Sequence, residues 1–210
     1  MTELIICGVG GHARVAFDIA ILNGFKPAGF LQITFSKFEF HDKFRKVNSE
    51  VLSIEELSHY ENLSIHIALG DNEKRSLAKE ILINRFQERV NFPNLIHPKA
   101  FISRNVDLGD GNLFAANSFI GVGSAIGNFN IINTGSTLDH DNSVGNFTSI
   151  APNVVTGGQV FIDDWAKLGI GAKISNNIRI GKKATVSAMS FVNQDVYDGQ
   201  TVFGVPAKVR

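Results

Sequence analysis

Hydrophobic side chains in the second half of the chain recur every six residues. The seventeen positions of this repeat are Ile96, Ile102, Leu108, Phe114, Ile120, Ile126, Ile132, Leu138, Val144, Ile150, Thr156, Ile162, Leu168, Ile174, Ile180, Val186 and Val192. Sixteen of the seventeen are apolar, and Thr156 is the exception. Asn and Gly occupy many positions between them, where a corner requires left-handed backbone angles. The repeat predicts a triangular parallel β-helix in which each hexad forms one face and one corner, and three hexads form one coil.

The preceding residues show no such repeat and alternate between strand and helix patterns. Apolar runs at Leu4–Cys7, Ala28–Ile33 and Ser64–Leu69 predict three strands. Helices are predicted over Ala13–Leu22 and from Asp71 or Asn72 to about Phe86, and Ser53–Glu56 has the spacing of a capping box. This alternation predicts a small Rossmann-like parallel sheet. We therefore expect an α/β domain over residues 1–92 and a β-helix over residues 93–210.

Composition and charge exclude several classes of protein. The 210 residues contain 20 Lys plus Arg and 20 Asp plus Glu, a zero net charge that argues against a nucleic-acid-binding protein. The single cysteine, Cys7, excludes an internal disulfide framework and a cysteine-based metal cluster. The short apolar run at the N-terminus is interrupted by glycine, which favours neither a signal peptide nor a membrane-spanning helix. We expect a cytoplasmic protein with no bound metal and no membrane partner.

Two short motifs carry candidate chemistry. In Asp139-His140-Asp141, the inward position of Leu138 makes His140 an outward residue near a corner, so it is either a polar turn residue or a general base beside carboxylates. The segment Gly8-Val9-Gly10-Gly11-His12-Ala13 follows a strand and opens a helix. Such a turn presents backbone N–H groups to a phosphate, although it can also be merely a tight connection.

The hexad array with Asp139-His140-Asp141, the ending Gly204-Val205-Pro206-Ala207-Lys208 and the front end Gly8–Val15 together resemble a known family. They are similar to the bacterial sugar acetyltransferases that join a nucleotide-binding domain to a left-handed parallel β-helix. That group includes nucleotide-linked 4-amino-sugar N-acetyltransferases and sialic-acid O-acetyltransferase-like enzymes. The resemblance implies transfer of acetyl from acetyl-CoA to the amino group of a nucleotide-linked 4-amino-4,6-dideoxysugar, for a surface polysaccharide or glycan. O-acetylation of a sugar hydroxyl is the alternative.

The resemblance also implies roles for individual residues. His140 would take the proton of the acceptor and Asp141 would support it. Asn133 would lie near the acceptor sugar, or else cap a corner. The nucleotide diphosphate would bind at Gly10, Gly11 and His12, with Gly70 near the base.

Other positions depart from the family pattern. Gln32 stands where relatives often carry an acidic residue that reads the nucleotide. Coenzyme A would contact Ser149, Ile170 and Ala188 between subunits of a homotrimer; some relatives have His at the position of Ser149 and Gly at that of Ala188.

Other functions fit the sequence less well. A zinc carbonic anhydrase needs three imidazoles, and only His97 and His140 lie in the repeat. An NAD-dependent oxidoreductase needs an acidic residue where Gln32 lies. A scaffold without activity is disfavoured by the outward Asp-His-Asp motif. The phenylalanine-rich segment 35–44 is either a loop over the nucleotide or, as we favour, a packed edge strand.

Overall fold

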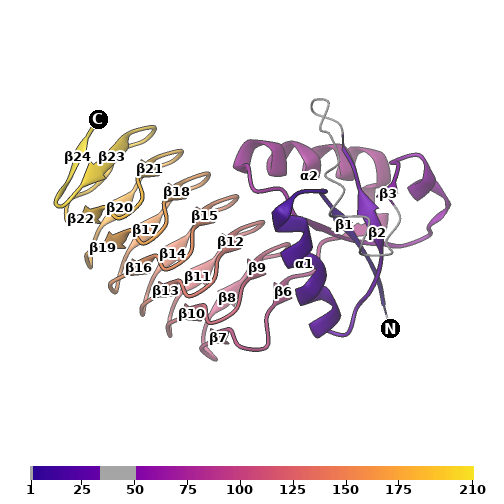
Figure 1. Ribbon diagram of the computed structural model, residues 1–210, viewed down its shortest axis with the longest axis horizontal. Helices are drawn as coiled ribbons and strands as arrows, with labels where there is room; N and C mark the ends of the chain where they lie inside the picture. The colour runs from indigo at the N-terminus through magenta and orange to yellow at the C-terminus, as the bar shows by residue number, and fades with distance from the viewer. Residues whose placement is uncertain (1, 34–50) are drawn as a thin grey trace. The chain divides into compact units, whose positions relative to one another are not determined.

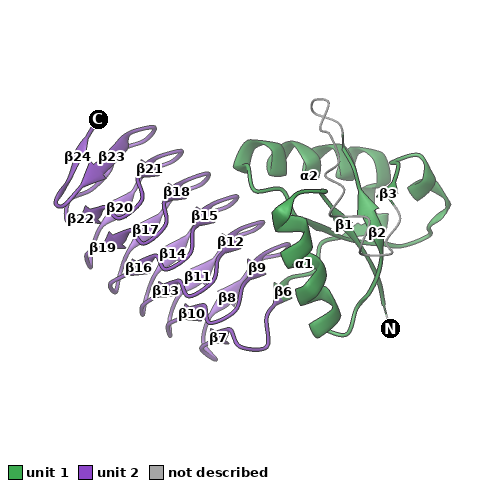
Figure 2. Cartoon of the chain, viewed as in Figure 1, with its two compact units in different colours: residues 1–95 green, residues 96–210 purple. Residues whose placement is uncertain are grey.

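The computed structural model describes residues 2–33 and 51–210 and divides the chain into two compact units, residues 1–95 and 96–210 (Figures 1 and 2). The phenylalanine-rich segment 35–44 lies outside the described residues. Neither α-helix of the described part has the length and apolar character needed to cross a membrane.

The first unit is a parallel five-stranded sheet with connecting helices. Its strands are β1 (Glu3–Cys7), β2 (Lys26–Leu31), β3 (Val51–Leu52), β4 (Leu63–Ile67) and β5 (Val90–Asn91), in the order β3-β2-β1-β4-β5. Its helices are α1 (Gly11–Leu22) and α2 (Asn72–Phe86), with short 3-10 helices η2 (Glu56–His59) and η3 (Gln87–Arg89). The predicted Rossmann-like sheet is confirmed. The chain turns to opposite sides of the sheet after β1 and after β4, and ligands bind at such a switch point in α/β folds.

Local sequence accounts for these elements. Strand β1 lies at the centre because four consecutive apolar side chains, from Leu4 to Cys7, are buried. Helix α1 begins at Gly11, two residues before the predicted start, so His12 belongs to its first turn. The Asp71 carboxylate caps α2 by accepting hydrogen bonds from two backbone N–H groups, of Glu73 and Lys74. The predicted capping box is also present, but it opens the short η2.

The second unit is a three-sided parallel β-helix. Its first face contains β7 (Phe101–Ile102), β10 (Phe119–Ile120), β13 (Thr137–Leu138), β16 (Val155–Thr156), β19 (Lys173–Ile174) and β22 (Phe191–Val192). Its second face contains β8 (Asp107–Leu108), β11 (Ala125–Ile126), β14 (Ser143–Val144), β17 (Phe161–Ile162) and β20 (Arg179–Ile180). Its third face contains β6 (Leu95–Ile96), β9 (Leu113–Phe114), β12 (Ile131–Ile132), β15 (Ser149–Ile150), β18 (Lys167–Leu168), β21 (Thr185–Val186), β23 (Thr201–Gly204) and β24 (Ala207–Val209), the last antiparallel to β23.

The strand register confirms three hexads per coil. Ile120 pairs with Ile102 on one side and with Leu138 on the other, eighteen residues away in each direction. The apolar residues of the repeat from Phe114 onward point into one continuous core. Thr156, the polar exception in the repeat, is also buried and is only 2% exposed.

Three edges join the faces and carry the corner residues. Edge 1, between the first and second faces, consists of residues 103–105, 121–123, 139–141, 157–159 and 175–177. Edge 2, between the second and third faces, consists of residues 109–111, 127–129, 145–147, 163–165 and 181–183. Edge 3, between the third and first faces, consists of residues 97–99, 115–117, 133–135, 151–153, 169–171 and 187–189.

The last residue of nearly every corner has the left-handed backbone angles that the sequence predicts, and along edge 2 three of these residues are aromatic. Phe129, Phe147 and Trp165 have φ between 55° and 58°, a conformation that bulky residues rarely adopt. Their rings form a continuous stack, with centroids 5.2 and 5.8 Å apart. Ring stacking is a favourable interaction that offsets the backbone cost at these corners.

Candidate active site

His140 lies at a corner of edge 1, between β13 and β14. Its Nδ1 is 2.8 Å from Oδ2 of Asp141, and both side chains are about half exposed, at 53% and 54%. The predicted outward position is therefore confirmed. The hydrogen bond to Asp141 raises the pKa of the His140 imidazole above its ordinary value, and the charge of Asp139 adds to this effect.

This pairing gives His140 the form of a general base. A carboxylate only accepts hydrogen bonds, so in the neutral ring Nδ1 carries the proton that is donated to Asp141. Nε2 then holds the free lone pair and can take a proton from a nucleophile. The nearby carboxylate stabilises the imidazolium that results.

The backbone of this corner is held by several hydrogen bonds. The N–H of His140 donates to Oδ1 of Asp139 at 2.8 Å, and the N–H of Asp141 donates to the carbonyl of Val122 in the preceding coil. Asp141 has a φ of 58°, which Asp tolerates better than most side chains. The left-handed corner therefore turns the carboxylate of Asp141 back toward the imidazole.

The other predicted transferase residues lie along a different edge. Asn133, Ile170 and Ala188 are corner residues of edge 3, and Ser149 is on β15 of the third face, which leads into that edge. Oδ1 of Asn133 accepts a hydrogen bond from the N–H of Thr134, so this amide caps its corner, as the structural alternative predicted. Within one chain these residues therefore do not lie near His140, because the first face separates edge 3 from edge 1.

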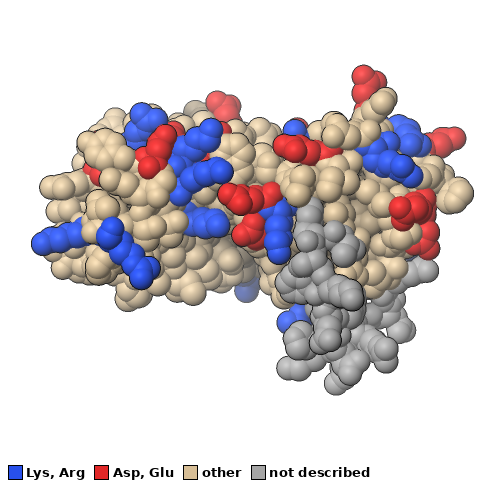
Figure 3. All heavy atoms as spheres, turned by 90° about the horizontal axis from the view of Figure 1, so that it is seen from above, with Lys and Arg blue, Asp and Glu red and all other residues tan. Residues whose placement is uncertain are grey.

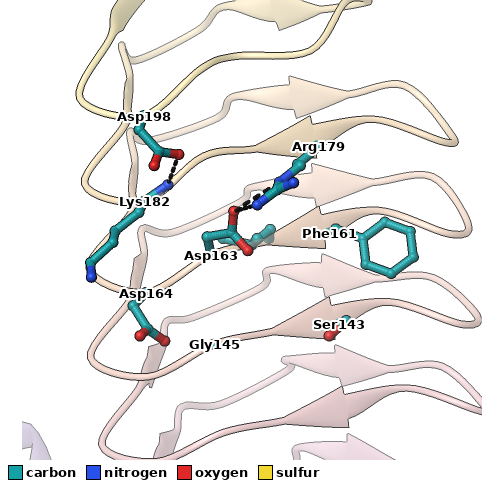
Figure 4. Close-up of a pocket in the computed structure, with 9 residues that line it drawn as sticks. Ser143, Gly145, Phe161, Asp163, Asp164, Arg179, Lys182 and Asp198 are labelled. Carbon is teal, nitrogen blue, oxygen red and sulfur yellow. Dashed lines mark hydrogen bonds and ion pairs between the residues drawn. The ribbon is translucent and has the colours of Figure 1, made fainter.

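A hollow of about 320 Å³ lies on the second face and edge 2 (Figure 4). Ser143 and Phe161 line it. Arg179 forms an ion pair with Asp163 at 2.8 Å, and the backbone N–H of Lys182 donates to Oδ1 of Asp198. These residues belong to neither of the two short motifs that carry candidate chemistry. Figure 3 shows further basic side chains gathered on the C-terminal coils of the β-helix.

The glycines at the end of β1 divide into two kinds. Gly8 has a φ of +133°, and a Cβ there would lie 2.7 Å from the carbonyl oxygen of Ala68, so the fold itself requires glycine. Gly10, Gly11 and Gly70 have ordinary backbone angles, and a Cβ on any of them would meet nothing closer than 4.0 Å. All three are exposed where β1 and β4 end. Gly10 is the N-cap of α1, where glycine is favoured, whereas no contact among the described residues accounts for glycine at Gly11 or Gly70.

His12 lies in this loop, but Nε2 of its ring is not accessible to a ligand. Its Nε2 is buried and has no hydrogen-bond partner among the described residues. Burial, together with His66 and Arg75 nearby, lowers its pKa to about 3, so the ring is neutral. His12 therefore offers no positive charge to a phosphate. Gln32, just past β2, is half-buried.

Sequence reasoning missed the buried cation of this unit. Arg75 is 1% exposed; its guanidinium donates to the carbonyls of Leu69 and Gly70 and to Oδ1 of Asn72. These hydrogen bonds hold the loop that follows β4 in place. Its position in the polar sequence of α2 gave no signal, because Arg on a helix is normally exposed. His66 is buried, and its Nδ1 lies 3.2 Å from the carbonyl of Pro93.

Comparison with known proteins agrees with this architecture. Residues 3–81 match the family model described as the PglD N-terminal domain. PerB from Caulobacter crescentus, solved in complex with CoA and GDP-perosamine, is 28% identical, with a TM-score of 0.89 over 100% of this chain and 98% of that one. In sequence and fold the chain is similar to sugar acetyltransferases of the hexapeptide-repeat superfamily. The predicted resemblance and the left-handed β-helix are thereby confirmed.

Two further relatives show how far the likeness extends. The acetyltransferase domain of PglB from Neisseria gonorrhoeae, in complex with acetyl coenzyme A, is 27% identical with a TM-score of 0.84, over 99% of this chain and 98% of that one. A 2,3,4,5-tetrahydropyridine-2,6-dicarboxylate N-acetyltransferase of Staphylococcus aureus is 46% identical over 50 residues. That match covers 24% of this chain and only 21% of the relative's length.

Proposed function

We propose that this protein transfers acetyl from acetyl-CoA to the amino group of a nucleotide-linked 4-amino-4,6-dideoxysugar, in the synthesis of a surface polysaccharide or glycan. The observation that carries the proposal is the His140–Asp141 pair, joined at 2.8 Å on an outward corner of the β-helix. Solved relatives bind CoA, acetyl-CoA and GDP-perosamine, which are the two kinds of substrate that this reaction needs.

The proposed reaction uses His140 as a general base. The amine nitrogen of the sugar attacks the thioester carbonyl, and Nε2 of His140 takes the proton that this nitrogen loses. The tetrahedral intermediate collapses, the carbon–sulfur bond breaks and coenzyme A leaves as a thiolate, to which the imidazolium can return the proton. Asp141 stabilises the imidazolium between these steps. The products are the N-acetylated sugar and coenzyme A, so atoms and charge balance.

The sugar nucleotide is proposed to bind where β1 and β4 end. The open glycines Gly10, Gly11 and Gly70 support this assignment, since a position without a side chain lets a ligand approach the backbone closely. Backbone N–H groups at the start of α1 suit a diphosphate. Gln32, an amide rather than a carboxylate, would both donate and accept toward the nucleotide.

We propose a homotrimer with acetyl-CoA bound between subunits. His140 is on edge 1, whereas Ser149, Ile170 and Ala188 lie at or beside edge 3, so a second copy is needed to complete the site. The first face also carries exposed aromatic side chains: Phe101 is 58% and Phe119 36% exposed, with rings stacked 5.3 Å apart. Burying such a surface against another copy is favourable. Light scattering should give about three times the chain mass of 22.9 kDa.

The deciding experiment measures release of the coenzyme A thiol from acetyl-CoA with a panel of acceptors. The panel contains UDP-, dTDP- and GDP-linked 4-amino-4,6-dideoxysugars and free sialic acid, each assayed beside His140→Ala. Turnover of one sugar nucleotide that is lost in the variant establishes the reaction, the acceptor and the base together. Turnover of sialic acid alone would replace N-acetylation by O-acetylation. Absence of both turnover and acetyl-CoA binding would favour a scaffold.

A further inference from the structure

The polar exception in the hydrophobic repeat lies directly beneath the His140 corner. Thr156 is buried, and its hydroxyl is 3.3 Å from the N–H of Asp139, whose hydrogen bond it accepts. The same hydroxyl donates to Oδ1 of Asn142 at 2.9 Å. An apolar residue at this position would fit the core register but would leave both groups without this partner.

Asn142 completes the support from the other end of the corner. Its Nδ2 donates to the carbonyl of Asp139 at 2.8 Å, to that of His140 at 3.2 Å and to that of Gly157 at 2.9 Å. Its own N–H donates to Oγ of Ser124 in the preceding coil. Asn142 is 1% exposed, so these bonds are made away from water, where they are strongest.

Gly158 leaves room for the imidazole of His140. It lies eighteen residues after His140, at the equivalent corner of the next coil, and its φ is not left-handed. A Cβ on Gly158 would lie 2.5 Å from Nε2 and 3.0 Å from Nδ1 of His140, and the ring would have to move. Neither backbone conformation nor packing against the core therefore explains glycine here; the imidazole of His140 does.

We propose that Thr156, Asn142 and Gly158 are positioning residues that hold the His140–Asp141 pair in its reactive geometry. The inference deepens the proposed function and rests on it, because it concerns the same base. Thr156 and Asn142 fix the backbone from which the pair projects, and Gly158 leaves the space in which the ring lies. A displacement of about 1 Å at a catalytic group can lower the rate by up to about a hundredfold.

The first test removes only the hydroxyl of Thr156. Thr156→Val should lower kcat about tenfold with little change in KM, and Thr156→Ser should restore most of the loss. The matched control is Thr148→Val, in the same coil, because the buried Thr148 hydroxyl likewise donates to an asparagine, Asn130, at 2.8 Å but at edge 2. Equal losses in the two valine variants, or no loss in Thr156→Val, would overturn the proposal.

The second test moves the ring. Gly158→Ala should lower kcat at least about tenfold in the otherwise unchanged protein. It should have no further effect in a His140→Ala background, because that variant has no imidazole for the added methyl group to displace; the two substitutions then form a double-mutant cycle. Full activity of Gly158→Ala, or an equal loss in both backgrounds, would contradict the positioning role.

A readout independent of activity separates this inference from the proposed function. NMR titration of the imidazoles, with the His140 signal assigned by its loss in His140→Ala, reports whether the ring still pairs with Asp141. The pKa of His140 should fall in Thr156→Val and Gly158→Ala and stay unchanged in Thr148→Val. If the unsubstituted protein transfers no acetyl group, the proposed function fails while this titration still tests the positioning. Unchanged titration in all three variants would refute the positioning itself.

Discussion

The two units of the chain use glycine for different reasons. Most glycines at the edges of the β-helix are crowded by the next coil; a Cβ on Gly121, for example, would lie 2.6 Å from the backbone of His140. In the first unit, a Cβ on Gly10, Gly11 or Gly70 would meet no described residue closer than 4.0 Å. A crowded glycine is explained by the fold, whereas an open glycine with ordinary backbone angles points to a ligand from outside. In the proposed function, the β-helix accordingly carries the base and the first unit binds the sugar nucleotide.

The strongest test of this division removes the base from the β-helix. His140→Ala should lower kcat by about 10²–10⁴-fold, the usual contribution of a general base. Binding of acetyl-CoA and of the sugar nucleotide should be retained, because the side chain is half exposed and supports no other element. Calorimetric titration and the thiol-release assay measure the two effects separately. A variant that keeps most of its activity would place the chemistry elsewhere.

Acid should affect the two units in opposite directions. Burial lowers the pKa of His66 to about 4 and that of His12 to about 3, so between those values and the ordinary pKa the unfolded chain binds more protons. Each histidine then removes about 1.4 kcal/mol of stability from the first unit for every pH unit below its unfolded pKa. The raised pKa of His140 acts the other way: its contribution is present at low pH and is lost as pH rises through the folded value.

Amide hydrogen exchange at pH 7 and pH 5, corrected for intrinsic rates, measures this difference. Protection of β1 and β4 should fall at pH 5 while protection of the β-helix core is maintained. His66→Leu should weaken the pH dependence of the first unit. A parallel loss of protection in both units would show that the buried histidines do not govern acid stability.

A single methyl group should separate binding from stability in the first unit. Gly11→Ala places a better helix former in the first turn of α1 and should raise the free energy of unfolding by about 0.5 kcal/mol. The added Cβ lies where we propose the diphosphate binds, so KM for the sugar nucleotide should rise about tenfold, or about 1.4 kcal/mol, with kcat nearly unchanged. Denaturant titration and steady-state kinetics provide both numbers.

The matched control is the crowded glycine of the same loop. Gly8→Ala should destabilise the unit by about 3 kcal/mol, through its positive φ and the close carbonyl of Ala68. If Gly11→Ala instead changed only kcat, or if both variants lowered stability alike, the distinction between open and crowded glycines would not hold.

The smallest expected effect is a shift in the pH profile. Asp141→Asn replaces the charged acceptor that raises the pKa of His140 with a neutral amide oxygen, so that pKa should fall. His140 acts as a base only when neutral, and the acidic limb of kcat/KM should therefore move to lower pH, with a lower plateau because the imidazolium loses its partner. Assays from pH 5 to pH 9 test this expectation. A limb that moves to higher pH would exclude Asp141 as the partner of the base.

Much of the β-helix was predictable because the same pattern of inward and corner residues recurs in every coil. Each inward residue, such as Ile120, pairs with its equivalents one coil away, so the period alone specifies strand, face and register. The first unit is harder to predict: α1 begins two residues earlier than expected, and the capping box at Ser53 opens only a short 3-10 helix. A single aperiodic element offers no second copy against which to check its boundaries.

The candidate site, too, was predictable from the sequence only in part. The outward position of His140 follows from the repeat, because Leu138 is the inward residue at the end of β13 and His140 lies in the corner that follows it. The roles of Thr156 and Gly158 do not follow, because both act on His140 from the next coil. Thr156 was visible as the exception in the repeat, but only the folded corner shows which groups its hydroxyl serves.

The sequence by itself determined the class of each unit, the coil of three hexads and the exposure of His140, because hydrophobic period and turn residues act locally. The tertiary structure decided the rest. It buried Nε2 of His12, separated the edge of His140 from that of Ile170 and Ala188, and placed Gly158 against the imidazole. Those outcomes depend on which residues of successive coils and loops come into contact, and contact between residues distant in the chain is created only when the whole unit folds.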